Sequence, residues 1–232
     1  MVVDCNEDGF REEHVRAICQ SGASTKTATS GYIGEKGIGF KSVFRIANKV
    51  KIQSGPFSFI FHANEADGLG MVTPWASDHE SLPMAVQTRM TLWLARPDDF
   101  PARLKDLEAI PESLMIFLNK LQRISLFVDD PPHVSQTSYS YRFDDSNIMG
   151  TLTKIMTGGM STQEFYVIKK DVSHLPKEEK REHTNKAQVV LAFPIDSDQE
   201  PLIEQQLVFA FLPIRKAGFS VGLTFNFCEY GC

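Results

Sequence analysis

The stretch Gly34-Glu35-Lys36-Gly37-Ile38-Gly39-Phe40-Lys41-Ser42 decides the expected fold of this 232-residue chain. Its glycines form a G-x-x-G-x-G pattern directly before apolar residues at helical spacing. Glycine allows positive φ angles and lets the backbone approach a ligand closely. Unpaired N–H groups at the start of a helix, together with the helix dipole, attract anions such as phosphate. We therefore predict a phosphate-binding turn that feeds a helix.

Two better-known glycine motifs do not fit this stretch. The Walker A motif needs glycine directly before Lys-Ser, whereas Phe40 precedes Lys41. The dinucleotide fingerprint has its glycines in the opposite order and follows a strand, whereas the polar segment Ser21–Tyr32 precedes this stretch. Taken alone, the pattern fits equally well a flexible turn that caps a helix.

The flanking sequence favours the phosphate-binding interpretation. Three stretches occur in a fixed order: Val2–Phe10 (VVDCNEDGF), Ser21–Lys26 (SGASTK) and Gly31–Phe44 (GYIGEKGIGFKSVF). Together they resemble the GHKL ATPases, which include gyrase, the heat-shock chaperone ATPases, histidine kinases and MutL. The similarity is greatest to the NO VEIN-like and sacsin-like proteins of plants and fungi, whose lid ends in I-G-x-K-G-I-G-F-K-S-V-F. Gln87–Leu92 and Phe209–Phe219 also match the family's pattern, so the resemblance covers nearly the whole chain.

The resemblance implies an α/β (α+β) fold, namely a Bergerat-type two-layer sandwich of a mixed sheet and helices. Relatives carry a Glu/Asn helix before the first motif, and this chain starts at that motif, so we expect an N-terminally truncated version. We expect a partial ATPase-like domain at residues 1–145. Residues 146–232 are expected to form a strand-rich continuation, or the start of a second domain.

Hydrophobic periodicity predicts where the helices and strands lie. Helical spacing occurs at Glu12–Gln20, from Gly37 to Ala47, at Leu104–Leu107 and at Glu112–Gln122. Short alternating or apolar runs predict strands at Val50–Gln53, Phe57–His62, Met90–Leu94, Ile124–Val128, Ser138–Phe143, Thr151–Met156, Glu164–Lys169, Ala187–Phe193, Leu207–Leu212 and Ser220–Phe227.

The resemblance also implies a set of nucleotide-binding residues. They are Asp4, Asn6, Gly9, Lys26, Gly34, Lys36, Gly37, Gly39, Lys41 and Thr88. In the family an acidic residue binds the adenine amino group, a glycine opens the pocket, the lid wraps the phosphates, and a strand threonine helps to bind adenine. Each of these residues also has an ordinary structural interpretation, such as a turn glycine, a solvated lysine or a strand threonine.

The position of the adenine-binding acid is open. Asp4 is the candidate, but strict counting puts Cys5 at the family's Asp position and Glu7 where the first glycine would stand. Either the loop carries one extra residue, or Asn6 and the backbone replace the usual contact.

The implied ligand is ATP, with Mg²⁺ as an accompanying ion. In the family the protein ligand of this Mg²⁺ is an Asn of the upstream helix, which also carries the catalytic Glu. Since both residues are missing from this chain, we expect weak or no hydrolysis. The alternative is a non-catalytic interaction module that kept the fold and lost the nucleotide. An active ATPase would need that Glu and Asn from elsewhere. Protein partners or a homodimer are expected by analogy.

Composition limits the other functions. The net charge of −5 and a pI near 5.7 give no electrostatic footprint for nucleic acid, and no dense Lys/Arg run favours a membrane surface. The four cysteines lack metal-like spacing and are typical of a reducing compartment. The apolar run Leu207–Ile214 is too short to span a bilayer. We expect an intracellular protein, cytoplasmic or nuclear.

Overall fold

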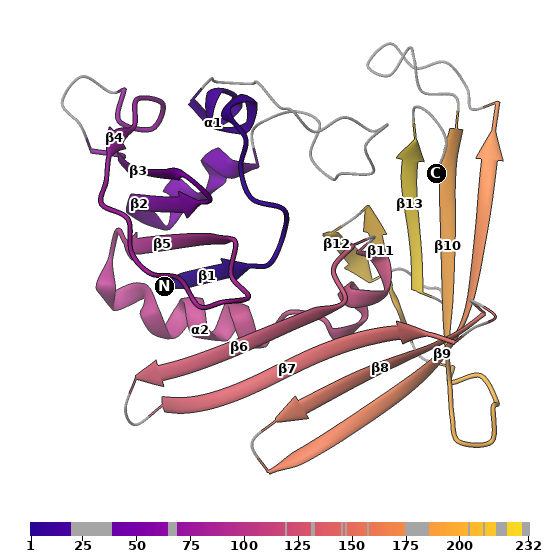
Figure 1. Ribbon diagram of the computed structural model, residues 1–232. Coiled ribbons are helices and arrows are strands. Elements are labelled where there is room, and N and C mark those ends of the chain that lie inside the picture. Colours follow the sequence, from indigo (N-terminus) through magenta and orange to yellow (C-terminus); the bar gives the residue numbers. More distant parts are fainter. Residues whose placement is uncertain are drawn as a thin grey trace. The chain divides into compact units, whose positions relative to one another are not determined.

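The computed structural model divides the chain into two compact units, Met1–Asp106 and Leu107–Cys232 (Figure 1). The division expected from the sequence falls instead at residue 145, in the connection between two neighbouring strands. The structure describes residues 1–19, 39–64, 69–118, 120–130, 133–144, 146, 148–156, 158–174, 186–203, 205–210, 212–216 and 222–228.

The first unit is built on a five-stranded antiparallel sheet with the strand order β1-β5-β2-β3-β4. Its strands are β1 (Val2–Cys5), β2 (Ala47–Ser54), β3 (Phe57–His62), β4 (Trp75–Ala76) and β5 (Thr88–Leu94). Gly55 and Pro56 join β2 to β3, and Gly55 has a φ of +52° that suits glycine. β2, the strand that follows the glycine-rich stretch, is the central strand of this sheet.

Alternating apolar residues bury one face of the first sheet. Val50 and Ile52 of β2 are fully buried, as is Phe61 of β3. Helix α1 (Glu12–Cys19) and the 3₁₀ helix η2 (Phe40–Arg45) contribute the apolar residues that pack against this face, among them Val15, Ile18, Phe40, Val43 and Phe44. Two short elements end the unit: η3 (Pro97–Asp99) and most of α2 (Phe100–Glu108) follow β5.

The second unit contains an eight-stranded sheet with the order β12-β11-β13-β10-β9-β8-β7-β6. Its strands are β6 (Arg123–Asp130), β7 (His133–Phe143), β8 (Met149–Met156), β9 (Gly159–Ser173), β10 (Lys186–Ile195), β11 (Leu207–Ala210), β12 (Leu212–Lys216) and β13 (Gly222–Cys228). All neighbours are antiparallel except β11 and β13. The sheet is strongly curved, since β6–β8 and β10–β13 run in clearly different directions (Figure 1).

The 3₁₀ helix η4 (Glu112–Phe117) covers the inner face of this second sheet. Met115 and Phe117 are almost fully buried there, and the Phe117 ring lies 4.3 Å from that of Phe209, centroid to centroid. The cluster also contains Tyr139, Tyr141, Leu152, Phe165, Val167, Val190 and Ala192.

The expected α/β (α+β) fold, a Bergerat-type sandwich of a mixed sheet and helices, is wrong. Strands dominate the described chain, in two almost entirely antiparallel sheets, and the two α-helices have only eight and nine residues. The helix expected at Glu112–Gln122 is the shorter η4, and the one expected from Gly37 to Ala47 is η2, which gives way to β2 at Ala47. In the described parts, no helix combines the length and the apolar character that a membrane span requires.

Candidate functional site

The neighbouring strands β1 and β5 form the floor of a pocket on the buried face of the first sheet. Val3 lies opposite Met90 in the register, and Leu92 follows two residues later on the same face. Asp4 and Arg89, one position along, face the other side, because successive side chains of a strand alternate between faces. The pocket floor is consequently apolar.

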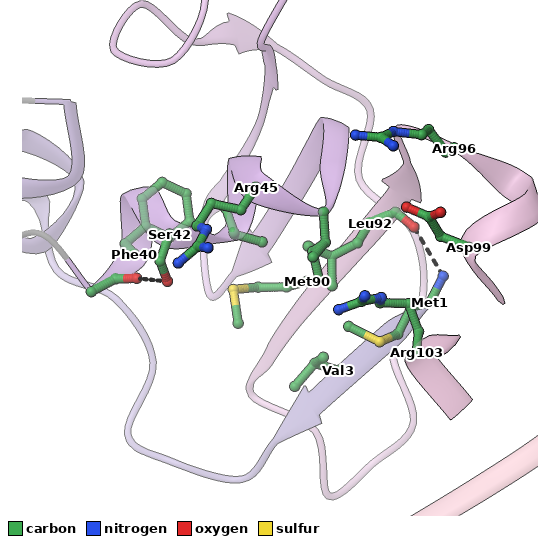
Figure 2. A pocket seen from close by; sticks show the side chains of 13 residues that line it. Met1, Val3, Phe40, Ser42, Arg45, Met90, Leu92, Arg96, Asp99 and Arg103 are labelled. Atoms are coloured by element: carbon green, nitrogen blue, oxygen red, sulfur yellow. Dashed lines mark hydrogen bonds between the residues drawn. The ribbon is translucent and has the colours of Figure 1, made fainter. Parts of the chain in front are cut away.

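The pocket is an open cavity of about 910 Å³ (Figure 2). Its walls come from η2 and its flanking residues on one side and from the stretch between β5 and the first turn of α2 on the other. The lining residues are Met1, Val3, Gly39, Phe40, Ser42, Val43, Arg45, Ile46, Met90, Leu92, Arg96, Asp99 and Arg103. Its volume falls in the range of small-molecule and cofactor sites.

Three arginines give the pocket its charge. Arg45 and Arg103 lie on either side of Met90 in Figure 2. Arg103 pairs with Asp106 at 2.7 Å but leaves its buried Nε without a hydrogen-bond partner, as far as the described residues show. Among the described residues, neither Arg45 nor Arg96 forms an ion pair. Asp99 is the acidic side chain among the described lining residues, so this described lining carries net positive charge and favours anions.

The glycine-rich stretch reaches the pocket through Gly39. Gly39 has a helical backbone conformation at the start of η2, and the Ser42 hydroxyl donates to its carbonyl at 2.6 Å. Four further predicted residues lie outside the described chain: Lys26, Gly34, Lys36 and Gly37.

Lys41 does not line the pocket. Its ammonium donates to the Met71 carbonyl and lies 5.1 Å from the centre of the Phe61 ring and 5.3 Å from that of Phe40. Burial among these groups lowers the pKa of Lys41, an effect that the Cys19 thiol partly offsets. Lys41 therefore acts here as a packed cation that joins η2 to the loop after β3.

A second polar cluster follows β1, where a chain of hydrogen bonds ties this segment to the sheet. The Phe10 amide donates to the Ser54 hydroxyl at 2.7 Å, and the Ser54 and Thr88 hydroxyls lie 2.5 Å apart. Thr88 donates its proton to a Glu7 carboxylate oxygen, so Ser54 must donate to Thr88. The other Glu7 oxygen accepts the Gly9 amide at 2.9 Å, and Gly9 has a φ of +81°. Glu7 is thus the acidic residue that accepts the hydrogen bond from Thr88.

The remaining predicted residues lie elsewhere. Asp4 forms a two-pronged pair with Arg89, both contacts 2.7 Å, on the face opposite the pocket. Asn6 is exposed in the loop after β1. The structure therefore brings Gly9 and Thr88 together and places Gly39 in the pocket, whereas Asp4 and Lys41 make contacts outside it.

Sequence reasoning missed several residues that the site contains. Glu7 could have been found, since it lies two residues before Gly9 at the position that breaks the family pattern. Arg45, Arg103 and Ser54 carried no usable signal, because their roles depend on contacts between segments that lie far apart in the sequence. Within the described chain, no group of three or more His, Cys, Asp or Glu side chains is placed to hold a metal ion.

Fold and site together define a protein of two mainly antiparallel sheets with an amphipathic pocket lined by three arginines. No family model matches the chain. The chain is 30% identical over 243 residues to Protein NO VEIN of Arabidopsis thaliana, a match that covers 94% of this chain and 8% of that protein. The predicted likeness to NO VEIN is confirmed, and the chain spans only a small part of that relative's length. Membership of the GHKL ATPases stays a prediction.

Proposed function

We propose that this chain binds an ATP-class nucleotide in the pocket and hydrolyses it weakly or not at all. The observation that carries the proposal is the meeting of three groups in one cavity. These are an apolar floor, three arginines and the end of the glycine-rich stretch. A nucleotide has matching parts, because the flat faces of its base pack against apolar side chains and its phosphates are anionic.

Each wall of the pocket would contact a different part of the ligand. The base would lie on Val3, Met90 and Leu92, and the phosphates would meet Arg45 and Arg103. Arginine suits this role because its planar guanidinium donates two parallel hydrogen bonds to phosphate oxygens. Gly39 has no side chain to keep the phosphates from the backbone.

The described acidic groups near the pocket support the expectation of weak hydrolysis. Hydrolysis with Mg²⁺ needs a base for the attacking water and oxygen ligands for the ion. Among the described lining residues Asp99 is the one carboxylate, and one carboxylate supplies one of these roles. Glu7, the other acid of interest, is already bound by Thr88 and the Gly9 amide.

Titration with a fluorescent ATP analogue, with and without Mg²⁺, tests the proposal. We expect saturable binding that Arg45→Ala weakens roughly 10- to 100-fold, as for loss of charge-assisted hydrogen bonds. Arg16→Ala is the matched control, because Arg16 is exposed on α1 of the same unit and pairs with Glu12. Absence of saturable binding at millimolar nucleotide would contradict the proposal.

A second candidate function is that of an interaction module without nucleotide. It is favoured by the exposed apolar side chains on the outer face of the second sheet, such as Phe127 and Met160. This candidate predicts a melting temperature that ATP does not change, since a ligand that binds only the folded state must stabilise it. An ATP-dependent rise in melting temperature would exclude it.

A further inference from the structure

Strand β6 forms one edge of the second sheet. It is eight residues long (RISLFVDD), contains no proline or glycine, and pairs with β7 on one side only, as far as the described residues show. Its other edge therefore presents unpaired N–H and C=O groups. Natural proteins usually protect such an edge with proline, charged side chains (lysine above all) or a bulge, or cover it. β6 contains no proline, no lysine and no bulge, and its charges lie at its two ends, so the middle of the edge, Ile124–Val128, carries no charge.

The side chains of β6 show which partner would fit. Arg123, Ser125, Phe127 and Asp129 share the outer face of the sheet, and all four are exposed. Phe127 is 69% exposed, which is high for a large apolar residue in a strand. Neither Arg123 nor Asp129 forms an ion pair with any residue in the described part of the chain. The strand thus carries opposite unpaired charges near its two ends.

We propose that β6 binds the β6 strand of a second copy of this chain, antiparallel and around a two-fold axis. In the register centred on Leu126, Arg123 lies opposite the partner's Asp129, and Ser125 lies opposite the partner's Phe127. A two-fold axis makes each contact twice, so the dimer contains two Arg–Asp pairs. The two eight-stranded sheets become one continuous sheet.

Neighbouring registers fit less well. A shift that sets Arg123 opposite the partner's Asp130 would join the outer face of one sheet to the inner face of the other, because side chains alternate with period two. Centring on Phe127 or on Ser125 keeps the faces matched but leaves the partner's Asp129 only diagonal to Arg123, two residues from the directly opposite position. The charges therefore select the register centred on Leu126. This interface is independent of the nucleotide pocket, which lies in the other unit.

Charge exchange tests the interface. Sedimentation of the 232-residue chain over a range of concentrations should show a monomer–dimer equilibrium. Arg123→Asp should raise the dimer dissociation constant roughly tenfold or more, because attraction becomes repulsion at two symmetric positions. Adding Asp129→Arg to that variant should restore the dimer. Arg142→Asp is the control, since Arg142 is exposed on β7, inside the sheet. A chain that is monomeric throughout, or a dimer that is indifferent to Arg123→Asp, would overturn the proposal.

A crosslinking experiment checks the register directly. A Ser125→Cys variant is mixed with a Phe127→Cys variant under mild oxidation. Residues directly opposite in an antiparallel pair have Cβ atoms about 4.5–5.5 Å apart, close enough for a disulfide. We expect the mixed disulfide to exceed the self-disulfide of either variant. Equal yields of all three products would rule out the proposed register.

Discussion

Tyr141 buries its hydroxyl in the core of the second unit without a hydrogen-bond partner among the described residues. The residue is 7% exposed and lies within the main apolar cluster. A buried polar atom that forms no hydrogen bond costs about 1–3 kcal/mol. We therefore expect Tyr141→Phe to raise the free energy of unfolding by about 1 kcal/mol in urea denaturation. A clear loss of stability would show that the hydroxyl is satisfied.

The same substitution has a pH signature. Burial raises the pKa of the Tyr141 phenol, so the folded protein keeps it neutral after the unfolded chain begins to ionise near pH 10. Stability from this residue is thus fully present below pH 10 and falls as the pH rises further. We expect the difference in free energy of unfolding between Tyr141→Phe and the parent to grow, in favour of the variant, between about pH 9 and 11. A constant difference would contradict the burial argument.

Gly150 lies directly against Tyr141. A Cβ atom at Gly150 would lie 2.2 Å from the Tyr141 hydroxyl and 2.7 Å from its ring, closer than real atoms approach. Gly150→Ala should therefore cost about 1–3 kcal/mol through overpacking, measured by urea or thermal unfolding. Gly159→Ala is the control, because nothing lies within 4 Å of the added methyl there. Equal effects of the two substitutions would argue against the close packing.

Thr88 joins β2, β5 and the segment after β1 through its hydroxyl. Thr88→Val removes the acceptor of Ser54 and the donor to Glu7 while it keeps the shape of the side chain. We expect a loss of about 1–3 kcal/mol in the free energy of unfolding. Thr88→Ser keeps the hydroxyl and should cost less. If valine and serine behave alike, the methyl group and not the hydrogen-bond chain matters at this position.

At the scale of elements, the β2–β3 hairpin depends on Gly55. Its φ of +52° lies in the left-handed region, and no atom lies within 4 Å of an added Cβ. Gly55→Ala should therefore cost about 1 kcal/mol from backbone strain alone. Gly55→Asn is the matched variant, since asparagine tolerates this conformation better and should cost less in the same denaturation experiment. An alanine variant as stable as the parent would contradict the strain.

The elements that the sequence predicted correctly are those with a strong local signal. Phe57–His62 is strand β3 as expected, because its alternating apolar residues match the buried face of the sheet. Glu112–Gln122 has helical spacing, yet only Glu112–Phe117 is helical and the chain continues into β6. Its apolar residues are buried against the second sheet, so their spacing reflects this contact and not a long helix.

At the scale of the molecule, the predicted fold was wrong because contacts between distant segments, and not local sequence patterns, decide it. The expected sandwich came from the order of short motifs, whereas strand pairing over long sequence distances decides the fold. Thr88 pairs with Cys5 of β1 and with Ser54 of β2, which are 83 and 34 residues away. The pocket arginines likewise come from η2, the loop after β5 and α2. Local sequence patterns carry little information about such pairing.

The division into two compact units makes a prediction about the whole chain. Each unit has its own sheet and its own apolar cluster, so we expect two thermal transitions in calorimetry. Gly55→Ala should lower the transition of the first unit, and Gly150→Ala should lower that of the second.

Nucleotide should act on one transition only. ATP at about one hundred times its dissociation constant adds about 2.7 kcal/mol to the state that binds it, which raises the melting temperature by several degrees. Because the pocket lies within the first unit, the transition that Gly55→Ala lowers should be the one that ATP raises. A single transition shifted by both substitutions would mean that the units unfold together. Two transitions that both ignore ATP would contradict the nucleotide proposal and leave the division into units intact.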